Sequence, residues 1–196
     1  MKNILNIIKD SDYSFTLFSK ALVDELDQNI KFRDGKPYVT CVIRDKEIVL
    51  KPEEIVRQLY LMKLIKEYGY PKKRIALEHP IHFGREVKSA DIVIFDKDRP
   101  NVEYIIVEIK KPKLQDGKNQ LRSYTNATGA PIAVWTNGRQ ISHYNRKDPN
   151  YGNEAEVEVN LPFKEAVPQF TASITGVPEG ERSNTLRDSQ RICRTL

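Results

Sequence analysis

The sequence predicts an α/β fold in which helices cover a sheet with buried central strands. Two apolar runs, residues 92–95 and 104–107, are almost continuous, which is typical of strands that are covered on both faces. An amphipathic helix begins at Pro52, and an Asn-Gly turn at residue 137 joins two further strand-like runs. From Lys51 onward the predicted order is helix, three strands, helix, two strands.

Composition predicts one main domain with a small appendage. The 196 residues are 39% hydrophobic, which suffices for one full core. The net charge of +5 favours a polyanionic partner such as nucleic acid without requiring one. Two cysteines form neither a disulfide framework nor a zinc pattern. Without a long apolar run or a secretory signal, the expectation is a cytoplasmic protein with no membrane partner.

Residues 1–50 predict a small α+β appendage. A helix is expected within residues 13–26, where apolar side chains recur at helical spacing: Phe15, Phe18, Leu22 and Leu26. Two short strands are expected at residues 38–43 and 47–50. Tight turns at Asp34-Gly35 and Arg44-Asp45 bound these strands.

Residues 51–170 predict the main domain. Pro52 and two glutamates open its first helix, and Gly69 and Pro71 end it. Strands are expected at residues 74–83, 90–95 and 104–109, followed by a helix at 116–128. Two more strands, 131–135 and 140–144, flank the Asn137-Gly138 turn. Residues 154–159 alternate like an edge strand, and the polar residues 171–196 predict a tail or linker.

Two acids and a lysine on the central strands predict a metal-dependent site. Asp91 begins one strand, and Glu108 lies near the end of the next. Lys110 shares the side of Glu108, while Ile109 turns away. Neighbouring carboxylates of this kind bind one or two hard divalent cations, Mg²⁺ by preference and Mn²⁺ as a substitute. The alternative is purely structural, with Glu108 and Lys110 as an ion pair and Asp91 in a turn.

Three segments resemble the core of PD-(D/E)xK nucleases: A-D-I-V-I-F-D, Y-I-I-V-E-I-K-K-P and Q-L-R-S-Y. P-E-E-I-V-R-Q and N-Q-L-R-S-Y-T-N-A-T-G-A, with W-T-N-G after it, are similar to the N-terminal nuclease domain of type I restriction enzyme R subunits. The resemblance covers about residues 51–145, although Ala90 stands where the motif name has proline. It implies a restriction-endonuclease-like αβββαβ core with a central mixed sheet flanked by helices.

The resemblance also implies roles for individual residues. Asp91, Glu108 and the backbone carbonyl of Ile109 would hold the metal, and Lys110 would be the catalytic lysine. An additional acid would come from the first helix, as Glu54 or alternatively Glu53. Gln120 and Tyr124 match the Q-x-x-x-Y motif and would position DNA, and basic residues would contact phosphates: Lys111, Lys113, Lys118 and Arg122.

The predicted function is therefore a Mg²⁺-dependent deoxyribonuclease, the endonuclease part of a type I restriction R subunit. Its expected partners are double-stranded DNA, a helicase-like motor region and methyltransferase and specificity subunits. ATP would act only through that separate motor region, because no G-x-x-x-x-G-K-[ST] loop occurs here. Two alternatives stay open: a non-cutting DNA-binding or assembly module of the same fold, and a stand-alone structure-specific DNA nuclease.

Overall fold

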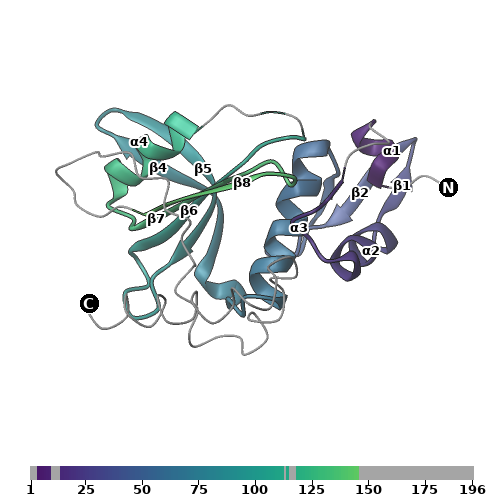
Figure 1. Cartoon of the computed structure of the whole chain (residues 1–196), viewed down its shortest axis with the longest axis horizontal. Helices are drawn as coiled ribbons and strands as arrows, with labels where there is room; N and C mark the ends of the chain where they lie inside the picture. The colour runs from purple at the N-terminus through teal and green to yellow at the C-terminus, as the bar shows by residue number, and fades with distance from the viewer. Residues whose placement is uncertain (1–3, 10–13, 113, 115–117, 146–196) are drawn as a thin grey trace, which may run out of the picture. The chain divides into compact units, whose positions relative to one another are not determined.

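A five-stranded sheet forms the centre of the computed structural model, which describes residues 4–9, 14–112, 114 and 118–145 (Figure 1). Its strands follow one another in chain order: β4 (Ile75–Phe83), β5 (Glu86–Phe95), β6 (Glu103–Ile109), β7 (Ile132–Thr136) and β8 (Ile141–Asn145). Neighbours are antiparallel except for β6 and β7. That parallel pair needs a crossover, which α4 (Lys118–Thr128) supplies.

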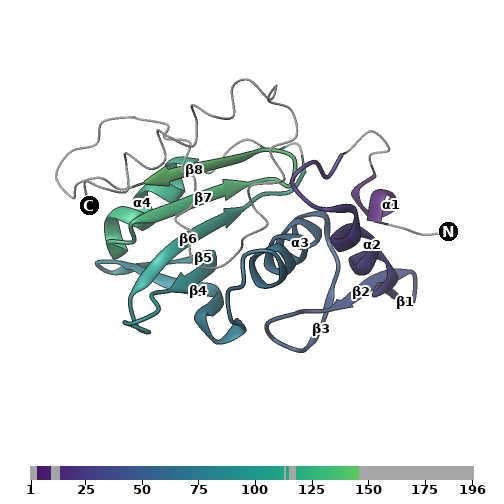
Figure 2. The same cartoon turned by 60° about the horizontal axis from the view of Figure 1, so that its bottom comes forward.

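The predicted fold class is confirmed. Helix α3 (Pro52–Lys66) precedes β4, and the described order is helix, three strands, helix, two strands. Figure 2 shows the mixed sheet with helices beside it. The strand predicted over residues 154–159 and the tail predicted over residues 171–196 lie outside the described residues. None of the helices within the described part is long and apolar enough to span a membrane.

Helix α4 packs on the sheet through one apolar stripe. Leu121 and Tyr124 are fully buried against Ile106 of β6 and Ala133 of β7. Complete burial of one large apolar side chain stabilises a fold by about 1.5–3 kcal/mol. The stripe therefore fixes which side of α4 lies next to the carboxylates of β5 and β6.

Helix α3 is buried along most of its length. Ile55 to Leu64 are buried except Lys63, and the run includes the polar residues Arg57 and Gln58. Pro52 occupies the first turn, where a missing backbone N–H costs no hydrogen bond. Polar side chains buried on a helix of this kind need partners, and those partners belong to the site described below.

The N-terminal segment contains α1 (Ile4–Ile8), α2 (Lys20–Gln28) and a separate antiparallel sheet of β1 (Lys31–Arg33), β2 (Lys36–Thr40) and β3 (Glu47–Val49). Asp34 and Gly35 form the first hairpin turn, both with positive φ. Helix α2 packs on α3. The backbone N–H of Val42 donates to Gln58 Oε1 at 3.1 Å, which also ties this segment to α3.

Several boundaries and two short elements differ from the sequence-based expectation. Helix α2 begins at Lys20 because Ser19 caps it, its Oγ accepting from the N–H of Leu22 at 3.4 Å. Phe18 instead closes a turn with Phe15 before the helix. Strand β1 was not predicted, and β2 ends at Thr40 rather than residue 43. Strand β5 begins four residues earlier than expected. Its first residues pair with β4, but they are exposed and show no apolar pattern that would have predicted a strand. A 3-10 turn (Lys72–Arg74) precedes β4.

Candidate active site

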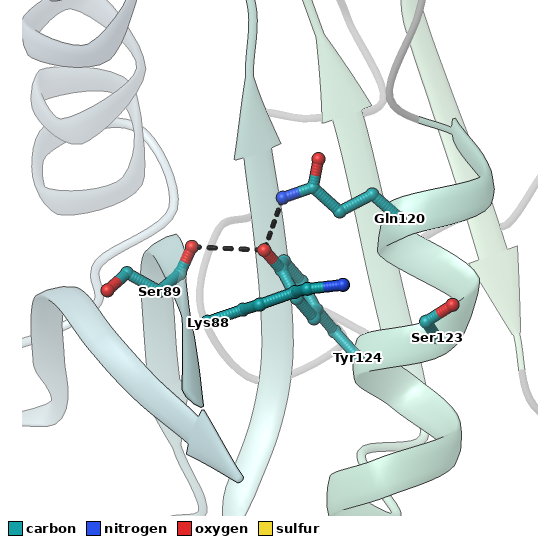
Figure 3. A pocket seen from close by; sticks show the side chains of 5 residues that line it. All are labelled: Lys88, Ser89, Gln120, Ser123 and Tyr124. Carbon is teal, nitrogen blue, oxygen red and sulfur yellow. Dashed lines mark hydrogen bonds between the residues drawn. The ribbon is translucent and has the colours of Figure 1, made fainter. Parts of the chain in front are cut away.

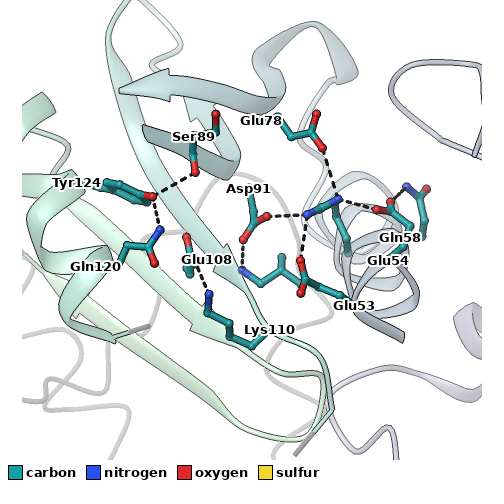
Figure 4. A network of polar contacts seen from close by, with 12 residues as sticks. Glu53, Glu54, Gln58, Glu78, Ser89, Asp91, Glu108, Lys110, Gln120 and Tyr124 are labelled. Atoms are coloured by element: carbon teal, nitrogen blue, oxygen red, sulfur yellow. Dashed lines mark hydrogen bonds and ion pairs between the residues drawn. The ribbon is translucent and has the colours of Figure 1, made fainter. Parts of the chain in front are cut away.

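Strand register places acidic residues side by side across the sheet. The pairs Ile92–Val107 and Val93–Ile106 fix β5 against β6, so Asp91 lies opposite Glu108. Opposed residues of antiparallel strands project from the same face, with their Cβ atoms about 5 Å apart. The register between β4 and β5 likewise places Glu78 opposite Asp91. Three strands therefore contribute a carboxylate at one level of the sheet (Figure 4).

Glu108 is a buried carboxylate with incomplete hydrogen bonding. It is 3% exposed, and Lys110 Nζ donates to its Oε1 at 2.8 Å. Within the described residues its Oε2 has no hydrogen-bond partner. Burial first, and the charge of Asp91 second, raise the pKa of Glu108 to about 7, against the lowering influence of Lys110. Lys110 therefore offsets only part of the cost of burying the Glu108 carboxylate.

Asp91 has partners at both oxygens. Its Oδ2 accepts from the backbone N–H of Ile109 at 2.8 Å, and its Oδ1 accepts from Arg57 Nη2 at 2.6 Å. Each carboxylate oxygen has two lone pairs, so acceptor capacity remains for a cation. The contact between Ile109 and Asp91 is through the Ile109 amide, and the metal-binding role of its carbonyl stays a prediction.

A buried guanidinium on α3 connects the helix acids to the sheet. Arg57 is 11% exposed, and its Nη1 donates to Glu54 Oε2 at 2.5 Å. Glu54 also accepts from Gln58 Nε2 at 2.8 Å. Its side chain is 14% exposed, whereas Glu53 is 45% exposed and lies 3.5 Å from Arg57. Both helix acids contact Arg57, and Glu54 is the more buried of the two and the one that accepts hydrogen bonds from Arg57 and Gln58.

Sequence reasoning did not identify Arg57 or Glu78 as site residues. The i, i+3 spacing of Glu54 and Arg57 was an available signal, since such residues meet on a helix surface. Glu78 has φ +52°, which L-residues seldom adopt in a strand. Its Oε2 accepts from Arg44 at 2.6 Å, and its Oε1 lies 3.9 Å from Arg57 Nη1. No local pattern marks that backbone conformation in advance.

The carboxylates are compatible with a bound cation but do not form a preassembled cage. Glu108 Oε2, which is buried without a partner in the described part of the chain, and the spare acceptor capacity of Asp91 suit Mg²⁺ or Mn²⁺, which prefer carboxylate oxygens and retain waters. Over the described residues, no group of three or more His, Cys, Asp or Glu side chains is arranged to hold a metal. A cation at this point would therefore depend on two side chains, backbone oxygen and water.

A pocket of about 460 Å³ opens between β5 and α4 beside these acids (Figure 3). Polar side chains line it: Lys88, Ser89, Gln120, Ser123 and Tyr124. Gln120 Nε2 donates to Tyr124 Oη, which in turn donates to the carbonyl of Ser89 at 3.2 Å. Ser89 lies two residues before Asp91, so the pocket reaches the level of the carboxylates.

The predicted basic stretch is described only in part. Lys111 is exposed, and Arg122 is exposed with its guanidinium 5.6 Å from the Tyr144 ring centre. Lys113 and the side chain of Lys118 lie outside the described residues. Lys88, which the sequence did not single out, supplies a cation at the pocket itself.

Comparisons with known proteins give one family and a similar solved structure. The model of the family "Type I restriction enzyme R protein N terminus" matches residues 52–160. No curated protein matches the chain significantly. A solved fragment of an HsdR subunit, assigned to a type I restriction enzyme of Vibrio vulnificus YJ016, is 23% identical, with a TM-score of 0.40. That similarity covers 47% of this chain and 21% of the solved one, so this chain spans about a fifth of that length.

Proposed function

The chain belongs to the family of type I restriction enzyme R protein N termini, and on this basis we propose that it is a Mg²⁺-dependent deoxyribonuclease domain of such a subunit. The observation that supports the proposal best is the pairing of Asp91 with Glu108, whose Oε2 is buried and, among the described residues, has no hydrogen-bond partner. Burying such an oxygen is costly unless a cation or a proton satisfies it. A cation shared with Asp91 would also offset the repulsion between the two carboxylates.

Asp91, Glu108 and the backbone carbonyl of Ile109 would hold the cation. When bound, it supplies a Lewis acid that polarises the scissile phosphate and lowers the pKa of a water. Lys110 lies 2.8 Å from Glu108 and brings a compact positive charge to the same level. Its ammonium would steady the charge that develops on the phosphate oxygens while the attacking water forms a new P–O bond and the bond to the leaving deoxyribose oxygen breaks. The water gives up a proton to solvent, and the leaving oxygen takes one from solvent to become a hydroxyl.

The pocket between β5 and α4 would position the DNA strand. Gln120 and Tyr124 are held on one side of α4 by their mutual hydrogen bond, and Tyr124 is anchored in the core. Lys88 would contact a phosphate beside the one that is cut, with exposed Lys111 and Arg122 as further phosphate contacts. Contacts of this kind give affinity that falls with salt and carries little sequence information. Sequence choice and ATP-driven movement would belong to other subunits and to a motor region.

The test is cleavage of supercoiled and linear DNA with Mg²⁺ or Mn²⁺, with and without a translocating partner. Asp91→Asn and Lys110→Met should bind DNA without cutting it, whereas Lys97→Met, an exposed lysine in the β5–β6 turn, should cut like the wild type. Cutting by the first two variants would refute the assigned chemistry. DNA binding without cutting, even with the partner, would support a non-cutting module. Cutting of branched DNA alone, without any partner, would support a stand-alone nuclease.

A further inference from the structure

Arg57 is surrounded by carboxylates from three elements (Figure 4). Its two terminal nitrogens lie 2.5 Å from Glu54 and 2.6 Å from Asp91. Glu53 and Glu78 follow at 3.5 Å and 3.9 Å. One guanidinium thus lies within 4 Å of four acidic side chains, on a helix that is buried along most of its length.

The charge of Arg57 is permanent in this place. Arginine stays protonated in proteins, and here its terminal nitrogens lie within 2.6 Å of Glu54 and Asp91. The planar fork binds a different carboxylate with each terminal nitrogen, which a single ammonium group cannot do with the same geometry. Arg57 therefore holds Glu54 and Asp91 together as a fixed bridge between α3 and β5.

We propose that Arg57 acts as a built-in cation between Glu54 and Asp91, so that the site binds one divalent ion rather than two. The proposal rests on the proposed nuclease function, because it concerns the metal that this reaction needs. Arg57 is here a positioning residue: it holds one oxygen of Asp91 away from any second ion and leaves the Glu108 side open.

The charges of the neighbouring side chains explain the expected effect of removing Arg57. Glu54 and Asp91 together carry two negative charges, and Arg57 neutralises one of them. Without Arg57 the pair is left with a charge of −2 and with unpaired oxygens from two carboxylates, a donor set that suits a hard divalent cation. The methionine variant, which is apolar and of similar length, should therefore create the second metal position that the arginine occupies.

The experiment is the stoichiometry of Mn²⁺ binding to the metal-free full chain at pH 8, by calorimetry and by electron paramagnetic resonance. The wild type should bind one ion, and Arg57→Met should bind two. Arg57→Lys keeps a cation and should bind one. The matched control is Arg74→Met, because Arg74 is also partly buried but donates to the carbonyl of Phe95 instead of a carboxylate. It should bind one ion.

Two results would refute this inference and leave the proposed nuclease function standing. They are two ions bound by the wild type, or one ion bound by folded Arg57→Met. Arg57→Gln makes the same comparison with a polar side chain and replaces the methionine variant should that one not fold. No bound ion in any variant would refute the metal dependence itself, and with it the proposed function. If Arg57 were only a structural bridge, Arg57→Met and Arg57→Gln would have lower thermal stability and would bind no additional metal ion.

Discussion

The raised pKa of Glu108 predicts a specific dependence of stability on pH in the metal-free protein. Because the carboxyl is buried beside Asp91, its pKa rises from 4.5 to about 7, so the folded state binds a proton more tightly than the unfolded state. By linkage, this contribution to the free energy of unfolding is fully present below pH 4.5 and is lost as pH rises toward 7. Above about pH 8 it has almost no further slope.

The magnitude follows from the two pKa values. A shift from 4.5 to about 7 corresponds to roughly 3 kcal/mol at 1.36 kcal/mol per unit, of which roughly 2.5 kcal/mol falls between pH 5 and pH 8. Glu108→Gln cannot ionise, so the difference in unfolding free energy between wild type and variant should change by that amount. Mn²⁺ requires the ionised carboxylate, so its affinity for the wild type should instead increase as pH passes through 7.

The assay is urea unfolding of the metal-free chain at pH 5, 6, 7 and 8, with m-values compared throughout. Ile106→Val is the control, because it shortens a buried side chain on the same strand, at a cost of about 1 kcal/mol, without removing a charge. It should keep the wild-type slope. Identical pH slopes in the wild type and Glu108→Gln would show that Glu108 does not titrate in this range, and the reasoning from burial would fail.

Three further predictions concern single side chains. Lys110→Met should lower the cleavage rate by about 100-fold or more and shift Mn²⁺ binding to higher pH, because Lys110 lowers the pKa of Glu108; unchanged kinetics and binding would contradict both roles. Lys88→Gln should reduce the slope of log affinity for duplex DNA against log salt by about 0.9, one phosphate contact, whereas Lys97→Gln should leave it unchanged; equal slopes would remove Lys88 from the DNA surface. Glu78→Gly should be more stable than Glu78→Ala by roughly 1–2 kcal/mol in urea unfolding, since both lose the carboxylate but only glycine adopts φ +52° without strain; equal stability would rule out strain there.

The sequence predicted the central fold because its signals are local and strong. Pro52 and the acids after it mark the start of α3, and two apolar runs mark β5 and β6. The E-x-K spacing predicted that Glu108 and Lys110 share a side, and their hydrogen bond confirms it. Neighbouring apolar strands then place Asp91 opposite Glu108 by register alone. The metal-binding and catalytic roles of these residues stay predictions.

What the sequence did not predict depends on long-range contacts. Arginine is common on exposed helix surfaces, so the residue type of Arg57 does not mark it as a site residue. Its contact with Asp91 depends on β5 lying next to α3. Glu78 adopts a left-handed conformation inside a strand because its neighbours hold it there, and its residue type gives no warning. The start of β5 is polar and exposed, so its pairing with β4 leaves no hydrophobic pattern. Each miss involves a polar residue whose conformation is set by another element.

The two carboxylates at the centre of the site differ in a way that has a chemical consequence. Asp91 accepts from a guanidinium and a backbone N–H, whereas Glu108 has one ammonium partner and, among the residues that the structure describes, one buried oxygen without any. A cation would therefore be stabilised most at Glu108. There it would contact the buried oxygen and reduce the repulsion between Glu108 and Asp91. Lys110 lies on that same side, so metal, lysine and phosphate would converge on Glu108. Arg57 keeps Asp91 in place from the opposite side.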